Sequence, residues 1–562
     1  MIEFIALNMA PIMFASLVLF LILGYPVAFS LAANGLVFFA IGVWLAPWSQ
    51  GEIALDWPLL FTMPQRLWGV ISNETLLAIP FFTFMGIILE RSGMAEDLLD
   101  TVGQLFGPVR GGLAFAVILV GALLAATTGV VAASVIAMGL ISLPIMLRYG
   151  YDRRVATGAI AASGTLAQII PPSLVLIILA DQLGVSVGDM YKGALFPGLI
   201  LTGMYIGYVA MLAIFRPHLV PALPAAARTL GGGVTSLIVA LAAATAVGYG
   251  AHHWYYDQWG ANADVLGASI GTLVIYFYAV LDGVLKLNLL SRLARQVIIV
   301  LIPPLALIFL VLGTIFIGLA TPTEGGAMGA MGALLLALFK GRLNLGITQS
   351  ALAATTRLAS FVMFILIGSR VFALTFYGVN GHIWVEHLLI GVPGGELGFL
   401  FVVNLIIFVL GFFIDFFEIA FILIPLIAVP AKTLGIDLIW LGVIVGMNMQ
   451  TSFLTPPFGF ALFYLRSVAA KVPYLDKITG RNIEGIKTSE IYKGAIPFIF
   501  VQVIMIFVVV LWPFSVTHYK TPLIDPSTIE IKIPALTPLG GIAPAPGGLP
   551  GLPQLGAPQV NP

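Results

Sequence analysis

The sequence contains no cysteine and few charged residues. Without cysteine the chain can form no disulfide, thiolate metal site or iron–sulfur cluster. Charged residues make up 9% of its 562 residues, against about 25% in an ordinary soluble domain. The 25 basic and 25 acidic residues balance and form no basic cluster, so nothing favours nucleic-acid binding. This composition excludes a soluble enzyme.

Motifs for nucleotide, haem and proton-pumping chemistry are also missing. The chain has no GxxxxGK[ST] motif, so it does not hydrolyse ATP. All six histidines fall in predicted loops or at interfaces, so no span supplies a buried pair to ligate haem. The spans hold almost none of the Lys and Glu that a proton pump uses. These absences count against a membrane subunit of a redox or proton-pumping complex, the alternative from a different class, and we expect no cofactor.

Long apolar runs dominate what is present. Hydrophobic residues make up 60% of the chain, and the mean hydropathy is +1.08. A membrane-spanning helix needs about 20 apolar residues, and such runs recur almost from end to end. We therefore predict an all-α polytopic membrane protein with twelve full spans. The predicted spans are 5–24, 26–47, 75–90, 155–182, 193–215, 234–250, 264–281, 297–319, 322–339, 352–379, 437–466 and 494–516.

Two further apolar stretches, 111–147 and 396–432, are interrupted near their middles by small or polar residues. Each is either two ordinary spans or one re-entrant hairpin, and the distribution of Lys and Arg can distinguish these. If both are hairpins and the N-terminus is outside, 19 of the 25 basic residues are cytoplasmic. The sequence therefore predicts an inner-membrane protein with two re-entrant hairpins and both termini in the periplasm.

Two segments of the chain carry the same pattern. Gly150 precedes Pro171 by 21 residues, Gly435 precedes Pro456 by the same interval, and a second proline follows each. By our count the two copies start seven crossings apart, so the second is inverted, as in secondary transporters. The predicted divisions are a first span (1–23), copy one (24–215), a connector (216–296) with an added helical pair (234–281), a linking span (297–319), copy two (320–516) and a disordered Pro/Gly-rich tail (517–562).

Each copy has a proline pair inside a predicted span, 155–182 in copy one and 437–466 in copy two. Two prolines remove two backbone donors and clash with preceding carbonyls, so neither span can be continuous helix. Unwound backbone at this depth is tolerated only where protein buries it or it lines a cavity. Its carbonyls and nearby Ser, Thr and Asn oxygens can coordinate a dehydrated cation, while half-helix N–H groups can bind a carboxylate. A packing kink is the alternative, which the symmetric recurrence disfavours.

Four ionisable residues lie clearly at membrane depth, namely Asp415, Glu418, Glu324 and Arg370. Burial of such groups is costly, so a functional role is the first interpretation. The alternative is structural, as an ion pair or hydrogen bond that holds a hairpin. The TPTE sequence at 321–324 reads equally well as a helix cap.

Several motifs together resemble the DctM-type large membrane subunit of tripartite ATP-independent periplasmic (TRAP) transporters. They are TPTEGGA at 321–327, SGTLAQIIPPS at 163–173, TSFLTPPFG at 451–459 and GFFIDFFEIAFILIP at 411–425. The resemblance covers about residues 5–215 and 297–516. It implies a sodium-driven symporter of dicarboxylates or other small organic acids, with a periplasmic substrate-binding protein and a small four-helix membrane subunit as partners. It also implies an elevator-type fold of the ion-transporter superfamily type, with two hairpins and two broken helices moving against a scaffold.

Carried over by position, the resemblance implies two sodium sites, each formed by a hairpin tip and a broken helix, and no transition metal. The implied residues are Thr127, Thr128, Gly129, Ser163, Gly164, Thr165 and Pro171 in copy one and Gly411, Asp415, Glu418, Asn448, Thr451, Thr455 and Pro456 in copy two. Thr165 and Thr451 hold near-matching positions, and each is expected to add a hydroxyl ligand.

The chain departs from the family pattern at both hairpin tips. Many relatives have a Gly-Ser-Ser-Val-Ala-Asp run at the first tip, where this chain reads GVVAAS at 129–134, so backbone carbonyls carry more of the coordination there. The second tip keeps Asp415 but continues with Phe416 and Phe417. Two alternatives stay open: a stand-alone sodium or proton anion symporter without a binding protein, and proton coupling through Asp415 and Glu418.

Overall fold

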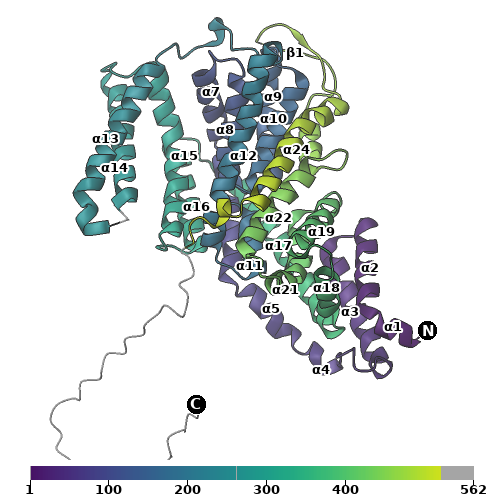
Figure 1. Ribbon diagram of the computed structural model, residues 1–562. Coiled ribbons are helices and arrows are strands. Elements are labelled where there is room, and N and C mark those ends of the chain that lie inside the picture. Colours follow the sequence, from purple (N-terminus) through teal and green to yellow (C-terminus); the bar gives the residue numbers. More distant parts are fainter. Residues whose placement is uncertain (1, 261–262, 477, 521–562) are drawn as a thin grey trace, which may run out of the picture. The chain divides into compact units, whose positions relative to one another are not determined.

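The computed structural model describes residues 2–260, 263–476 and 478–520, except for the side chains of residues 127, 128, 259 and 264. The described chain is helical apart from one short pair of strands (Figure 1). The protein is therefore an all-α polytopic membrane protein, as the apolar runs predict.

The N-terminal helices and the first copy precede the connector. Their bounds are α1 (Ile2–Leu7), α2 (Met9–Ile22), α3 (Val27–Leu45), η1 (Ala46–Trp48), α4 (Trp57–Leu60), α5 (Met63–Ile71), η2 (Glu74–Leu77), α6 (Ala78–Arg91), α7 (Met94–Phe106), α8 (Gly112–Thr128), α9 (Val131–Arg148), α10 (Arg153–Thr165), η3 (Leu166–Gln168), α11 (Leu174–Leu183) and α12 (Val187–Phe215).

The connector, the linking helix and the second copy follow. Their bounds are η4 (Pro217–Leu219), η5 (Ala225–Ala227), α13 (Val234–Trp259), α14 (Ala263–Leu285), α15 (Arg292–Phe316), α16 (Pro322–Phe339), α17 (Leu345–Gly378), α18 (Gly381–Ile390), α19 (Gly395–Leu410), α20 (Phe416–Ile422), α21 (Ile424–Thr433), α22 (Leu438–Leu454), α23 (Phe460–Val468), β1 (Tyr474–Leu475), β2 (Asn482–Ile483), α24 (Thr488–Leu511) and α25 (Phe514–Thr517).

The two copies pack against each other in a reciprocal way, because the opening helix of each packs on a later helix of the other. Helix α3 of copy one packs on α17, and α16 of copy two packs on α6. Small residues allow the first approach, because a side chain on Gly35 would meet the backbone of Phe372 at 2.9 Å. Thr375 then donates a 2.8 Å hydrogen bond from Oγ1 to the Gly35 carbonyl. Close helix contact through glycine is typical of membrane helices.

Helix lengths bear on the predicted crossings. Nine helices in the described residues are long and apolar enough to span a membrane, and twelve if each of three bent pairs counts as one. The long stretches 111–147 and 396–432 each divide into helices joined by a short break, α8 with α9 and α19 with α20 and α21. Helix α9 is among the nine, so its length alone does not separate a hairpin arm from a crossing. The re-entrant assignment stays a prediction.

Several helices start earlier than hydropathy predicts, because polar caps extend them. Helix α12 begins at Val187, where Ser186 Oγ accepts from the Asp189 N–H at 3.3 Å. Helix α17 begins at Leu345, where Asn344 Oδ1 accepts from the Ile347 N–H at 2.8 Å. These side chains satisfy donors that a helix N-terminus leaves unpaired, so a polar first turn can precede the apolar run.

Helix α7 and the polar insert near residues 472–486 form ties between the copies. Asp97 on α7 pairs with Lys340 at 3.0 Å and Arg342 at 2.9 Å in the loop before α17. In the insert, β1 and β2 pair antiparallel, and Asp476 between them pairs with Arg148 of α9 at 3.0 Å. Hydropathy finds neither tie, because α7 is amphipathic and the strands are two residues long.

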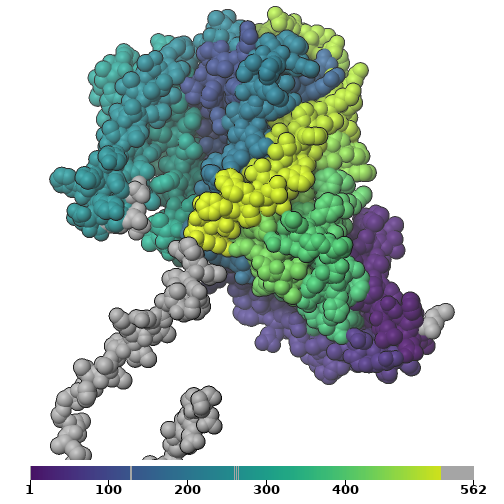
Figure 2. Space-filling view, in the orientation of Figure 1, coloured from purple at the N-terminus to yellow at the C-terminus, as the bar shows by residue number. Residues whose placement is uncertain are grey.

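The added pair α13–α14 packs against α15 and not among the helices that carry the proline pairs. Figure 1 shows it standing beside α15, apart from α10 and α22. Its contacts form a separate apolar cluster that includes Ile275, Leu293 and Val297. In the space-filling view, α24 lies across the visible face of the helices, next to α12 (Figure 2).

Candidate functional site

The first hairpin tip lies on the first broken helix. Gly129 joins α8 to α9 with φ of +61°, and a side chain there would meet Leu174 Cγ at 2.9 Å. Leu174 starts α11, directly after the proline pair. Nearer the start of the break, Gly164 packs directly on the α9 backbone at Val135. Tip and break therefore meet, as the sequence predicts for this copy.

The proline pair interrupts the helix between α10 and α11. Pro171 and Pro172, joined by a cis bond, have no N–H groups to offer to the carbonyls of Ala167 and Gln168 four positions before. Ser173 Oγ replaces one of these donors, at 3.0 Å from the Gln168 carbonyl. The Ala167 carbonyl has lost its intrahelical donor, and no other hydrogen bond between described residues reaches it, so it can bind a ligand.

Thr165 is the centre of a buried hydrogen-bond network. Its Oγ1 donates to the Ala162 carbonyl at 2.8 Å and accepts from the side-chain amides of Gln450 and Gln502, each at 3.3 Å. Gln502 also donates to Tyr205 OH at 2.8 Å. The four side chains Thr165, Gln450, Gln502 and Tyr205 are at most 1% exposed. Every hydrogen-bonding position of the Thr165 hydroxyl is therefore used by protein.

This network crosses between equivalent positions of the two copies. Asp152 and Asp437, 285 residues apart, cap α10 and α22 in the same way, each accepting from N–H groups two and three positions on. The same separation relates Thr165 to Gln450, which is one residue before Thr451. The predicted near match of Thr165 with Thr451 is thus off by one residue, and the hydrogen bond joins the true equivalents.

Gln168 lies in the first break with its side-chain amide buried. Its exposed fraction is 0%, and neither Oε1 nor Nε2 has a hydrogen-bond partner among the described residues. Buried polar groups are nearly always hydrogen-bonded in native proteins, so such an amide indicates a ligand or water position. Ser163, also buried, donates from Oγ to the Ile160 carbonyl at 3.0 Å.

The second hairpin tip lies on the second broken helix. A side chain on Gly411 would collide with Ser452 of α22. Asn448 donates from Nδ2 to the Asn404 carbonyl of α19 at 2.6 Å. Thr451 donates from Oγ1 to the Met447 carbonyl at 3.1 Å, and no donor among the described residues reaches its hydroxyl oxygen. That oxygen keeps two lone pairs for a ligand.

The second break is more open than the first. Pro456 and Pro457, again joined by a cis bond, deprive Ser452 and Phe453 carbonyls of their helical donors. The Thr455 N–H bonds to the Ser452 carbonyl at 3.1 Å, which leaves the Phe453 carbonyl, at the position of Gln168 in the first break, without its helical donor. Phe458 is 45% exposed, whereas all residues of the first break are buried.

Asp415 and Glu418 cap helix α20. The Glu418 carboxylate accepts from the Asp415 N–H at 2.9 Å, and Asp415 Oδ1 accepts from the Phe416 N–H at 2.7 Å. Thr321 and Glu324 make the same reciprocal box at the start of α16, and Glu324 is exposed. For Asp415, Glu418 and Glu324, these hydrogen bonds therefore support the structural interpretation, in which the acids cap helices.

Two other predicted positions do not join the breaks. Arg370 is exposed on α17, away from the ion pairs between described residues. Thr127 and Thr128 end α8 next to Gly129, and their side chains lie outside the described part of the structure. Among the described side chains, the first break therefore offers the Gln168 amide and the Ser163 hydroxyl oxygen to a ligand.

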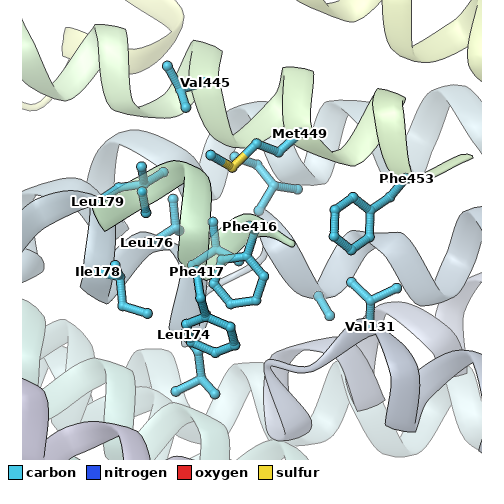
Figure 3. Close-up of a cluster of buried hydrophobic side chains, with 14 of the residues drawn as sticks. Val131, Leu174, Leu176, Ile178, Leu179, Phe416, Phe417, Val445, Met449 and Phe453 are labelled. Carbon is cyan, nitrogen blue, oxygen red and sulfur yellow. The ribbon is translucent and has the colours of Figure 1, made fainter. Parts of the chain in front are cut away.

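An apolar cluster lies beside the second hairpin tip. Figure 3 shows Phe416 and Phe417 from the second tip next to Leu174 of α11 and beside α22, while Val131 from the first tip lies farther to the side, below Phe453 in this view. The Phe416 and Phe417 ring centroids are 3.8 Å apart, and both residues are nearly fully buried. The two aromatic residues that depart from the family pattern are thus part of the buried apolar core.

The comparisons identify the family. The model of the tripartite ATP-independent periplasmic transporter, DctM component, matches residues 14–514. The chain belongs to the DctM family. It is 31% identical over 408 residues to the C4-dicarboxylate TRAP transporter large permease protein DctM of Pseudomonas aeruginosa, covering 72% of this chain and 79% of that one.

Other relatives of this large permease component carry different substrate names. The ectoine TRAP transporter large permease protein TeaC of Halomonas elongata is 26% identical over 510 residues, covering 90% of this chain and 97% of that one. The isethionate TRAP transporter permease protein DctMQ of Oleidesulfovibrio alaskensis is 25% identical over 470 residues, covering 83% and 62%. The crystal structure of the YdaH transporter of Alcanivorax borkumensis shares the fold with a TM-score of 0.51 at 15% identity, covering 86% and 98%.

Sequence reasoning missed Gln168, Gln450, Gln502 and Tyr205. The signal was present, because an uncharged amide inside an apolar span must find a hydrogen-bond partner. What could not be read was the partner, since the Gln450 to Thr165 bond joins residues 285 apart.

Proposed function

We propose that this large permease subunit imports a small organic acid by sodium symport. The observation that carries the proposal is the pair of mirrored breaks, each touched by a hairpin tip and each offering uncharged oxygens. Sodium is a hard cation that prefers several oxygen ligands, and neutral oxygens bind it without burying a second charge. Elevator movement of hairpins and broken helices against the remaining helices is part of the same proposal.

The two breaks offer different ligand sets. In the first, we infer that the Ala167 carbonyl, the Gln168 amide and the carbonyls of the tip at Gly129 hold the ion. Thr165 is not a ligand, because its hydroxyl already makes three hydrogen bonds within the protein. Its role is to hold the broken helix in place. In the second, the Thr451 hydroxyl and the Phe453 carbonyl lie on the broken helix next to the tip at Gly411.

The family supports a transporter that works with two partners. A periplasmic substrate-binding protein delivers the substrate, and a small four-helix membrane subunit completes the permease in the inner membrane. Relatives of similar identity are named for C4-dicarboxylate, ectoine and isethionate, so identity favours none of these substrates. Half-helix N–H groups at the breaks suit the carboxylate that the proposal assigns to the substrate.

Proton coupling through Asp415 and Glu418 is the second candidate. It is weaker, because both carboxylates cap α20 through backbone N–H groups. A stand-alone symporter is the third, and it differs only in needing no binding protein.

Uptake into proteoliposomes tests the proposal. The chain is reconstituted with its small subunit, and uptake of a labelled organic acid is measured with and without the binding protein, in sodium or in choline. We expect uptake only with the binding protein and with sodium. Uptake that is unchanged in choline contradicts sodium coupling, and uptake without the binding protein supports the stand-alone alternative.

A further inference from the structure

The added pair α13–α14 encloses a groove of about 480 Å³. Thr235 and Ser236 line one end of it, and apolar side chains of the two helices line it from there to Val247 and Val274. Ile275 forms part of its buried floor. The pair stands beside α15 in Figure 1, away from both breaks, so the groove is no part of the ion sites.

The dimensions of the groove fit one hydrocarbon chain. From Ser236 to Val247 the helix rises about 17 Å, at about 1.5 Å per residue. One leaflet contributes about 15 Å to the hydrocarbon core of a bilayer. The volume of about 480 Å³, spread over that length, leaves room for a slender, flexible chain that lies along the two helices. An acyl chain of one leaflet therefore matches the groove in length.

The polar end of the groove is fixed to the loop between α14 and α15. The Ser291 N–H donates to Ser236 Oγ at 3.1 Å, and Ser291 Oγ donates to the Gly233 carbonyl at 3.1 Å. Leu289 and Leu290 of this loop line the groove. The loop thus forms a rigid mouth.

Positive charge surrounds this mouth. Lys286 and Arg292 flank the loop and are exposed, and neither has an acidic partner among the described residues. Arg295 is neutralised by the buried Asp282 at 3.5 Å, and Asp282 Oδ1 also accepts from the Leu289 N–H at 2.8 Å. Asp282 is therefore occupied, and the positive charges of Lys286 and Arg292 next to the mouth remain without an acidic partner in the described chain.

We propose that the groove binds one acyl chain of an anionic phospholipid, whose phosphate lies between Lys286 and Arg292. The lipid comes from the leaflet on the side of the basic loops, where such residues attract anionic head groups. The apolar groove supplies length selection, and the two charges supply the preference for an anionic head group. The proposal does not depend on the coupling ion.

Native mass spectrometry of the full chain in detergent, with added phosphatidylglycerol or phosphatidylcholine, tests the proposal. We expect the parent chain to retain one phosphatidylglycerol at least fivefold better than phosphatidylcholine. The double variant Lys286→Gln with Arg292→Gln should lose this preference, whereas Lys471→Gln with Lys493→Gln, two exposed lysines elsewhere, should keep it. Equal retention of both lipids by the parent overturns the proposal, as does an unchanged preference in the first double variant.

A second experiment fills the groove with a bulky side chain and so distinguishes a lipid occupant from a protein occupant. Ala243→Trp blocks the groove, and Ala242→Trp, on the same helix but outside the lining, is the matched control. We expect only Ala243→Trp to lose bound phosphatidylglycerol, with unchanged melting temperatures. If Ala243→Trp instead releases the co-purified small subunit and leaves lipid binding intact, a protein occupies the groove and the proposal fails. If it does not fold, the charge variants still decide.

Discussion

The two breaks have the same plan but different surroundings. The first, around Pro171, is buried throughout and is tied to copy two by the amides of Gln450 and Gln502. The second, around Pro456, opens at Phe458, and its Thr451 hydroxyl oxygen accepts from no donor in the described chain. Duplication thus preserved the backbone interruption and not the side-chain chemistry. The first break keeps the unpartnered amide of Gln168, and the second keeps the hydroxyl oxygen of Thr451.

Inversion of the copies gives the largest expected effect, because labelling is all or none. The chain has no cysteine, so Arg154→Cys in the first turn of α10, next to the loop before it, and Lys432→Cys in the last turn of α21, next to the loop before α22, each introduce one exposed thiol. With re-entrant hairpins and inverted copies, these loops lie on opposite sides. We expect a membrane-impermeant maleimide to label Arg154→Cys only from the cytoplasm and Lys432→Cys only from the periplasm. Labelling of both from one side contradicts the inversion.

Replacing the two threonines should separate the breaks in stability. Thr165→Val leaves two buried amide donors without an acceptor and should lower the free energy of unfolding by about 2 kcal/mol. Thr451→Val removes only a bond to its own helix and should cost less than about 1 kcal/mol. Denaturant unfolding of the purified variants measures both. If both variants lost the same free energy of unfolding, the hydrogen bonds from Gln450 and Gln502 would not stabilise the first break more than the second.

The insert of copy two stabilises copy one through a charge. Hydrogen bonds from Arg148, and then from Thr479, lower the pKa of Asp476 from 3.8 to about 2. Because the folded-state pKa is lowered, this contribution to stability is complete above about pH 4 and is lost as the pH falls toward 2. We expect Asp476→Asn to have a lower melting temperature than the parent at pH 7. Below pH 4 the difference between the two melting temperatures should become smaller.

Glu484→Gln is the matched control for this ion pair. Glu484 pairs with Arg153 at 2.5 Å but its side chain is 71% exposed, so solvent screens the pair. Its substitution should change the melting temperature less than Asp476→Asn does. A difference between Asp476→Asn and the parent that stays constant from pH 7 to pH 2.5 would exclude titration of Asp476 as the cause.

Excision of residues 229–284 should have the smallest effect on the breaks. The α13–α14 pair forms an apolar cluster of its own with α15, outside both copies. Joined by a short linker, the remaining chain should fold and bind sodium with the parent's affinity, as measured by titration calorimetry. A folded chain that no longer binds sodium would place α13–α14 within the ion-binding region.

Sequence reasoning reached the fold through features that repeat. The proline pairs and the Asp152 and Asp437 caps can be recognised from their equal spacing in the two copies. The helices α7 and α18 were missed, because neither is a long apolar run. Within the candidate site, the tips and breaks were predictable from small residues and prolines. The roles of Gln168 and Gln450 were not, since they depend on which distant side chains share the interior.

Sodium titration of purified Thr451→Val tests the central claim most directly, that uncharged oxygens at the breaks bind the coupling ion. Losing one ligand should cost about 1–3 kcal/mol, which raises the sodium dissociation constant roughly 5- to 100-fold. Thr245→Val is the matched control, because Thr245 on α13 makes the same bond to the carbonyl four residues before, at 2.9 Å. We predict weakened binding for Thr451→Val alone. Unchanged sodium affinity in Thr451→Val would contradict the assignment of the second break as a sodium site.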